Sequence, residues 1–256
     1  MSTKFTLAAA TIAAALVTAP LAAQAPAATP KAADATKAAA PKTADGTKAA
    51  NGAWTPLFDG KSLAGWRGYK KENAAETRWK VEGGLLTLPA NDGKDTRGAR
   101  DIISTGTYDN FDLRWEWKAA PGANSGLKYF VLEDQPSAIG HEYQLIDDER
   151  HPDAKIGPHR QTAALYDVFP AADRPIKPAG EWNTSEVRVH GAHVEHWLNG
   201  KKVLEYELNS PKLKEAVAKS KFKDIARFGT PQKGHILLQD HGDQVWFRKV
   251  EIRQAK

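Results

Sequence analysis

Short runs of alternating apolar and polar residues fill the chain from Trp54 onward, separated by Gly, Pro, Asn and Asp. Alternation with a period of two is typical of strands that bury one face of a sheet. The pattern predicts strands over residues 79–81, 85–88, 101–104, 111–118, 126–132, 142–146, 164–166, 186–190, 193–198, 202–207, 235–239 and 245–253. Many short strands with little helix predict an all-β fold, a two-sheet antiparallel β-sandwich or jelly roll.

Two local signals refine this prediction. Asn199-Gly200 lies between two predicted strands, and both residue types tolerate positive φ, so the pair predicts a tight hairpin. Ser210 can cap a helix, Pro211 suits its first position, and apolar residues recur within 212–219, which predicts one short helix. Residues 155–177 are predicted to form a loop around the strand at 164–166.

The alternation also assigns faces to the strands. The core is expected to include the inward-facing apolar residues Leu113, Trp115, Val187, Val189, Ile236 and Leu238. In 126–132, the expected inward set is Leu127, Tyr129 and Val131, and the opposite set is Gly126, Lys128 and Phe130.

Polar residues interrupt several of these apolar runs. Glu142 and Gln144 share one face of their strand, so His141 is expected to face the other way. If strands 126–132 and 142–146 pair, Lys128 joins Glu142 and Gln144 on one sheet face. Burying such groups unpaired costs about 1–3 kcal/mol each, so their convergence indicates a site or a structural ion pair.

The N-terminal segments differ from the rest of the chain. Residues 1–23 combine Lys4 with a short apolar stretch and are predicted to be a secretory signal peptide, which places the mature protein in the periplasm or outside the cell. Residues 24–52 are rich in Ala, Pro and Lys and are predicted to be a flexible linker. Residues 53–256 are then expected to form one domain, with no membrane insertion.

Composition excludes several kinds of chemistry. The net charge of +5 includes one unit from Lys4 and two from 24–52, so the domain keeps only +2 and nucleic acid is not an expected partner. The chain has no cysteine, which excludes disulfides, thiolate metal sites and a cysteine nucleophile. The chemistry must therefore use oxygen and nitrogen groups.

Ordered motifs across 54–253 resemble the 3-keto-disaccharide hydrolase domain family. They are Trp54-Thr-Pro-Leu-Phe-Asp-Gly-Lys-Ser-Leu-Ala-Gly-Trp66, Asn124-Ser-Gly126, Gly140-x-Glu142-Tyr143-Gln144 with Asp147, Trp182-Asn183, His196-Trp-Leu-Asn-Gly200 and Gly234-His-Ile-Leu-Leu-Gln239-Asp-His-Gly242. The resemblance implies a concanavalin-like jelly roll with a sugar site on its concave face. It also implies cleavage of glycosides already oxidised at carbon 3, which an upstream sugar 3-oxidoreductase must supply.

The implied chemistry fits the residue types. A ketone at carbon 3 acidifies the carbon 2 proton, so a base can remove it and the enolate can expel the substituent on carbon 1 before water adds. Glu142 is the expected base, Lys128 an expected donor to the enolate oxygen and His241 a proton shuttle. The residues expected to bind substrate are Gln144, Asn124, Gln239, Tyr166, Trp182 and His196.

Alternatives remain for several of these residues. Glu142 could form a structural ion pair with Lys128, and Trp182 could belong to the core. His193 and His196 have opposite parity, so at most one reaches the cleft, and His196 matches the family motif. A divalent cation is a possible cofactor, with Glu142, Asp147 and His151 as candidate ligands.

Two other functions are compatible with the same fold. One is a non-catalytic, lectin-like carbohydrate-binding module, which needs aromatic platforms and neutral amides. The other is a hydrolase of unoxidised glycans that uses paired carboxylates.

Overall fold

The computed structural model describes residues 52–94 and 100–255. The predicted signal peptide (1–23) and all but the last residue of the predicted linker (24–52) lie outside the described residues. Within the described part of the chain, no helix is both long and apolar enough to cross a membrane.

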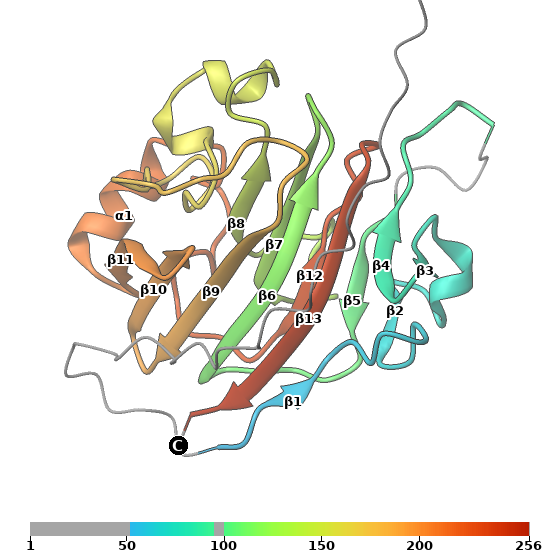
Figure 1. The fold of residues 1–256 in the computed structure, drawn as a ribbon. Coiled ribbons are helices and arrows are strands. Elements are labelled where there is room, and N and C mark those ends of the chain that lie inside the picture. Colours follow the sequence, from blue (N-terminus) through green and yellow to red (C-terminus); the bar gives the residue numbers. More distant parts are fainter. Residues whose placement is uncertain (1–51, 95–99, 256) are drawn as a thin grey trace, which may run out of the picture. The chain divides into compact units, whose positions relative to one another are not determined.

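Two antiparallel sheets pack face to face (Figure 1). The larger sheet has eight strands in the order β11-β10-β9-β6-β13-β4-β3, with β1 also paired to β13. Its strands are β1 (Thr55–Pro56), β3 (Lys80–Glu82), β4 (Leu85–Leu88), β6 (Phe111–Ala119), β9 (Asn183–His190), β10 (His193–Leu198), β11 (Lys201–Glu207) and β13 (Val245–Gln254).

The smaller sheet has five strands in the order β2-β5-β12-β7-β8. They are β2 (Trp66–Gly68), β5 (Ile102–Ser104), β7 (Asn124–Val131), β8 (His141–Ile146) and β12 (His235–Leu238). The predicted two-sheet sandwich is therefore confirmed. The prediction from alternation did not include β1 and β2, because strands of two and three residues are too short to show a period.

The core lies between the sheets, as alternation predicts. Leu113 and Val187 are fully buried there, as are Val189, Ile236 and Leu238, and Trp115 is 1% exposed. The single α-helix of the described chain, α1 (Pro211–Ala218), begins after Ser210, whose hydroxyl accepts the Leu213 N–H. Asn199 and Gly200 have φ values of 48° and 83°, which the predicted hairpin requires.

Two face assignments in β7, those of Phe130 and Val131, are wrong. Phe130 has a φ of 61°, which breaks the alternation of the strand. Phe130 therefore turns into the core beside Tyr129, and Val131 packs with Ile103 and Leu237 in a small separate cluster.

The segment predicted as a strand at 164–166 is not a regular strand. Leu165 forms only isolated bridges with Tyr143 and Phe169. Ala163 and Asp167 both have left-handed φ values, 66° and 61°, which end the extended conformation on each side. The segment still lies along β8, in the region of the one-turn helices η2 (Asp153–Lys155) and η3 (Pro158–Arg160) in Figure 1. The third one-turn helix, η1 (Ala74–Glu76), follows β2.

Candidate functional site

Glu142 and Lys128 lie opposite each other on the outer face of the five-stranded sheet, because the antiparallel register of β7 and β8 pairs them directly. Lys128 Nζ lies 3.7 Å from Glu142 Oε2, and the side chains are 12% and 5% exposed. Lys128 also donates to the Ala138 carbonyl at 3.1 Å. The ammonium is the countercharge of a carboxylate that is otherwise nearly out of water.

A hollow at Gly126 receives the Glu142 carboxylate. A Cβ at position 126 would lie 2.6 Å from Glu142 Oε1, so only glycine leaves room for this group. Gln144 lies opposite Gly126, and the amide orientation that satisfies its hydrogen bonds places its nitrogen 2.9 Å from Ser125 O and 3.2 Å from Glu142 Oε1, as a donor to both. Each carboxylate oxygen therefore has one partner, Lys128 for Oε2 and Gln144 for Oε1. This arrangement suits a general base.

A pocket of about 390 Å³ opens beside this carboxylate. Asp101, just before β5, and Lys221, after α1, line it together with Lys128 and Glu142. Burial raises the pKa of Asp101, although nearby Lys128 and the N–H of Asp240 oppose this shift. The pocket thus combines two carboxyl groups with two ammonium groups.

Tyr166 lies beside Lys221, one of the residues that line this pocket. Its N–H donates to the Glu142 carbonyl at 3.0 Å, and its hydroxyl donates to Asp153 Oδ2 at 2.8 Å. Burial raises the pKa of Tyr166, so the phenol keeps its proton near neutral pH. Lys221 Nζ lies 4.1 Å from the centre of the Tyr166 ring.

Gln239 and Asn124 extend the polar strip along the same sheet. The Gln239 N–H donates to Gly126 O at 2.9 Å, and Gln239 Oε1 is buried without a hydrogen-bond partner in the described structure. Asn124 is 4% exposed and lies two residues before Gly126 on β7. The Asn124 N–H donates to Asp243 Oδ2 at 2.9 Å, so the strip joins the Glu142 side of the sheet to the loop that carries Asp243.

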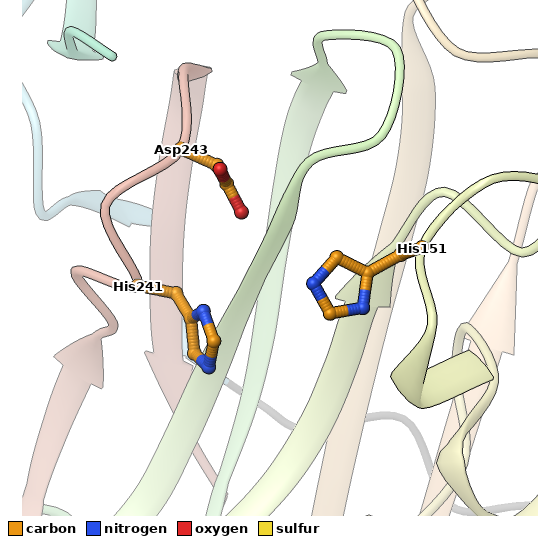
Figure 2. A group of neighbouring side chains, drawn as sticks. All are labelled: His151, His241 and Asp243. Atoms are coloured by element: carbon orange, nitrogen blue, oxygen red, sulfur yellow. The ribbon is translucent and has the colours of Figure 1, made fainter. Parts of the chain in front are cut away.

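His241 lies with His151 and Asp243 rather than with Glu142. Figure 2 shows the three side chains facing one another, and their ligand atoms all lie within 4.8 Å of one another. Two imidazoles and a carboxylate are a donor set for a transition-metal ion. However, His151 Nδ1 accepts the Asp153 N–H at 3.1 Å, so neutral His151 carries its proton on Nε2. The cluster fits a metal only if this hydrogen bond is broken.

Asp147, another residue considered as a metal ligand, organises a turn instead. Its carboxylate accepts N–H groups of Gly122 at 2.7 Å and Glu149 at 3.0 Å, and it pairs with the Arg150 guanidinium at 3.1 Å. The structure therefore separates the three candidate ligands: Glu142 binds Lys128, Asp147 caps a turn, and only His151 joins a ligand cluster.

Trp182 lies away from the pocket. Its ring contacts Arg248 at 4.0 Å and Lys118 at 5.3 Å, two side chains of the eight-stranded sheet. This position supports a structural role for Trp182.

His196 is fully buried in the core. His196 Nδ1 lies 2.8 Å from the Ala163 carbonyl, which can only accept, so Nδ1 carries the proton. Its Nε2 must then accept from the Tyr129 hydroxyl at 2.8 Å. Burial lowers the pKa of His196 to about 4. The position supports a structural role rather than contact with substrate.

His141 lies at the other end of a buried chain of hydrogen bonds that runs from His196 through Tyr129 and Tyr206. The Gly229 N–H donates to His141 Nε2 at 3.0 Å, so Nδ1 carries the proton and donates to the Tyr206 hydroxyl at 2.7 Å. Tyr206 in turn lies 2.6 Å from the Tyr129 hydroxyl. Burial lowers the pKa of His141 to about 3. These hydrogen bonds tie the backbone at Ala163 and at Gly229 to the core.

Sequence reasoning missed Asp101, Lys221 and Asp243. Asp101 shares strand parity with Ile103, and the pairing of β5 with β12 brings it beside Gln239. That pairing could not be read from the sequence. Lys221 follows a helix and has no strand periodicity, so the sequence holds no local signal for its position.

The chain matches a known protein family and a named relative, and both agree with the resemblance seen in the sequence motifs. The family model described as "3-keto-alpha-glucoside-1,2-lyase-like domain" matches residues 53–253. The chain is 36% identical over 223 residues, 77% of each protein, to one named 3-keto-disaccharide hydrolase from Bacteroides thetaiotaomicron.

Solved structures agree with the fold. A protein from Parabacteroides distasonis described as a glycosyl hydrolase superposes with a TM-score of 0.71 at 30% identity, covering 79% of this chain and 94% of that one. A Bacillus subtilis protein with a galectin-like fold gives a TM-score of 0.50 at 13% identity over 79% of this chain and 95% of that one, which supports the fold alone.

Proposed function

We propose, because this chain belongs to the 3-keto-alpha-glucoside-1,2-lyase-like domain family, that it cleaves the glycosidic bond of 3-keto-glycosides, including 3-keto-disaccharides. The observation that carries the proposal is the nearly buried Glu142 carboxylate, which lines an open pocket with Lys128 and Gln144 as its partners.

Glu142 is the base in this mechanism. It removes the proton on carbon 2, which the neighbouring ketone has acidified, and the enolate then expels the substituent on carbon 1. Water adds to the resulting double bond to give the free 3-keto sugar. Lys128 pairs with Glu142 and donates to the enolate oxygen, which is the site of developing negative charge.

The pocket lining favours catalysis over simple binding. A lectin-like module would present aromatic platforms and neutral amides, whereas this pocket presents Asp101, Lys128, Glu142 and Lys221. Elimination also needs no second carboxylate in the geometry of an ordinary glycosidase, because the substrate ketone makes the carbon 2 proton labile.

The cellular setting follows from the chemistry and from the predicted signal peptide. The substrate must come from an oxidoreductase that oxidises a sugar at carbon 3. Export by residues 1–23 would place the enzyme in the periplasm or outside the cell, and N-terminal sequencing of exported protein tests this.

The direct test compares a 3-keto-glucoside with its unoxidised parent. Purified protein should release the alcohol from the 3-keto-glucoside and leave the parent intact. Cleavage of both at similar rates would favour an ordinary glycan hydrolase. Binding of the keto sugar without product, with divalent cations supplied, would favour the binding module.

A further inference from the structure

Lys221 is held at the pocket by an aromatic stack. Phe222 stacks on Phe228 with 4.1 Å between ring centres and 8° between planes, and Phe228 stacks on His141 at 4.6 Å. On the other side, the Lys221 N–H donates to Asp167 Oδ2 at 2.8 Å. Both contacts fix the backbone at residue 221, although it lies outside any helix or strand.

The Lys221 ammonium has unused hydrogen-bonding capacity. Within residues 52–94 and 100–255 its Nζ makes no hydrogen bond or ion pair, and its nearest described partner is the Tyr166 ring at 4.1 Å. Lys128, the other ammonium of the pocket, is already engaged by Glu142 and the Ala138 carbonyl. Since an ammonium carries three N–H donors, Lys221 can give one to a ligand.

The surroundings make this ammonium a better acid. Burial by the surrounding protein is the main cause that lowers the pKa of Lys221, and Lys128 and Arg160 lower it further. Glu142 and Asp167 act in the opposite direction. Lys221 is surrounded by protein on one side but lines an open pocket on the other, so its ammonium can regain a proton from water after each turnover.

We propose that Lys221 is the general acid that protonates the leaving oxygen of the glycoside. The proposal rests on the function proposed above and adds a residue to it. Glu142 takes the carbon 2 proton and a double bond forms between carbons 1 and 2. The bond from carbon 1 to oxygen breaks, its electron pair goes to that oxygen, and a proton from Lys221 Nζ completes the alcohol. The products are an enone and an alcohol, with Glu142 protonated and Lys221 neutral, and exchange with water restores both.

The position of each lysine supports this division of roles. Lys128 already has two partners, the Glu142 carboxylate and the Ala138 carbonyl, and is the proposed donor to the enolate oxygen. Lys221 can lose a proton without breaking any ion pair. Lys221 lies on the loop after α1 and Glu142 on β8, so the two groups come from different elements of the pocket lining.

The test varies the leaving group. An alkoxide leaves slowly without a proton, whereas 4-nitrophenolate needs little help. Lys221→Met should lower turnover of methyl 3-keto-glucoside about a hundredfold and that of 4-nitrophenyl 3-keto-glucoside less than about fivefold. Lys221→Arg keeps the charge but gives up a proton much less readily, so it should remain slow on the methyl glycoside. Lys223→Met, two residues away on the same exposed loop, should match wild type on both.

Other outcomes overturn the proposal. Equal losses on both substrates in Lys221→Met would assign Lys221 to binding or to the enolate oxygen. Full rescue by Lys221→Arg, or no loss in Lys221→Met, would remove it as an acid. If wild type cleaves neither keto-glucoside, the proposed function itself fails. That result is seen with wild type alone, whereas failure of the Lys221 proposal is seen only when wild type is active and the Lys221 variants are compared with it.

Discussion

The outer faces of the two sheets carry similar charged residues but use them differently. On the eight-stranded sheet, arginines and carboxylates of the same strand or of neighbouring strands pair with one another. The pairs are Arg114 with Glu251, Arg188 with Glu186, Arg248 with Glu116 and Arg253 with Asp112. Tryptophan rings lie against several of these cations, for example Trp54 at 4.0 Å from Arg114 and Trp182 at 4.0 Å from Arg248.

The five-stranded sheet carries fewer charges on its outer face and leaves some of their capacity unused. Gly126 provides a hollow, and Gln239 has a buried oxygen without a described partner. Lys221, a loop residue that lines the same pocket, has no described ion pair at its Nζ. Charge alone therefore does not identify a site in this fold. A site in this fold is identified by open space beside a carboxylate together with polar groups that lack a hydrogen-bond partner.

The largest difference between the two sheets is expected when one carboxylate on the outer face of each is replaced by an amide. Glu142→Gln keeps the shape but cannot accept the carbon 2 proton, so turnover of a 3-keto-glucoside should fall at least about a hundredfold. Glu116→Gln makes the same chemical change on the outer face of the eight-stranded sheet and should keep wild-type turnover. Steady-state rates, with circular dichroism as a folding check, measure this. Near-wild-type turnover in Glu142→Gln would remove Glu142 from the mechanism.

The hollow can be filled without changing any charge. In Gly126→Ala the new Cβ would lie 2.6 Å from Glu142 Oε1, so the carboxylate must move. Turnover should fall about tenfold or more, because small displacements of a catalytic group are costly. Combined with Glu142→Gln, the alanine should cause no further loss. Additive losses would show that Gly126 acts independently of Glu142.

Acid should lower the free energy of unfolding, because two histidines of the buried hydrogen-bond chain are neutral in the folded protein. The pKa of His141 is lowered to about 3 and that of His196 to about 4, against about 6.5 in the unfolded chain. Below pH 6.5 the unfolded state binds more protons, so stability is complete above that pH and falls as pH drops toward 4.

Each histidine contributes up to about 1.4 kcal/mol per pH unit to this loss. Urea unfolding of wild type and His141→Gln at pH 7 and pH 5 measures it, and the variant should show the smaller pH dependence. Equal stability of wild type at the two pH values would contradict the assignment of neutral histidines.

The smallest effect is expected when an ion pair on the outer face of the eight-stranded sheet is removed. Arg114→Met removes one partly exposed ion pair and one contact with Trp54. The free energy of unfolding should fall by no more than about 1–2 kcal/mol, the usual scale for such interactions. Turnover of a 3-keto-glucoside should be unchanged. A large loss of turnover would mean that this face also contributes to function.

Much of the pocket could be predicted from parity and family motifs, because it lies on two strands. Glu142, Gln144 and Lys128 share a face in the sequence pattern, and the register of β7 and β8 brings them together. Trp182 and His196 also match family motifs. A motif match does not report which side of a sheet a ring packs on, and the structure places Trp182 against Arg248 and His196 in the core.

The sequence alone determined the features that depend on neighbouring residues: the alternating strands, the Asn199-Gly200 turn and the cap at Ser210. Local sterics and hydrogen bonds fix these features within a few residues. Tertiary structure decided what depends on distant pairs. Phe130 breaks its strand because its ring packs in the core, and Lys221 reaches Tyr166 because Phe222 stacks on Phe228. Such positions follow from packing between elements far apart in the chain, which no local pattern records.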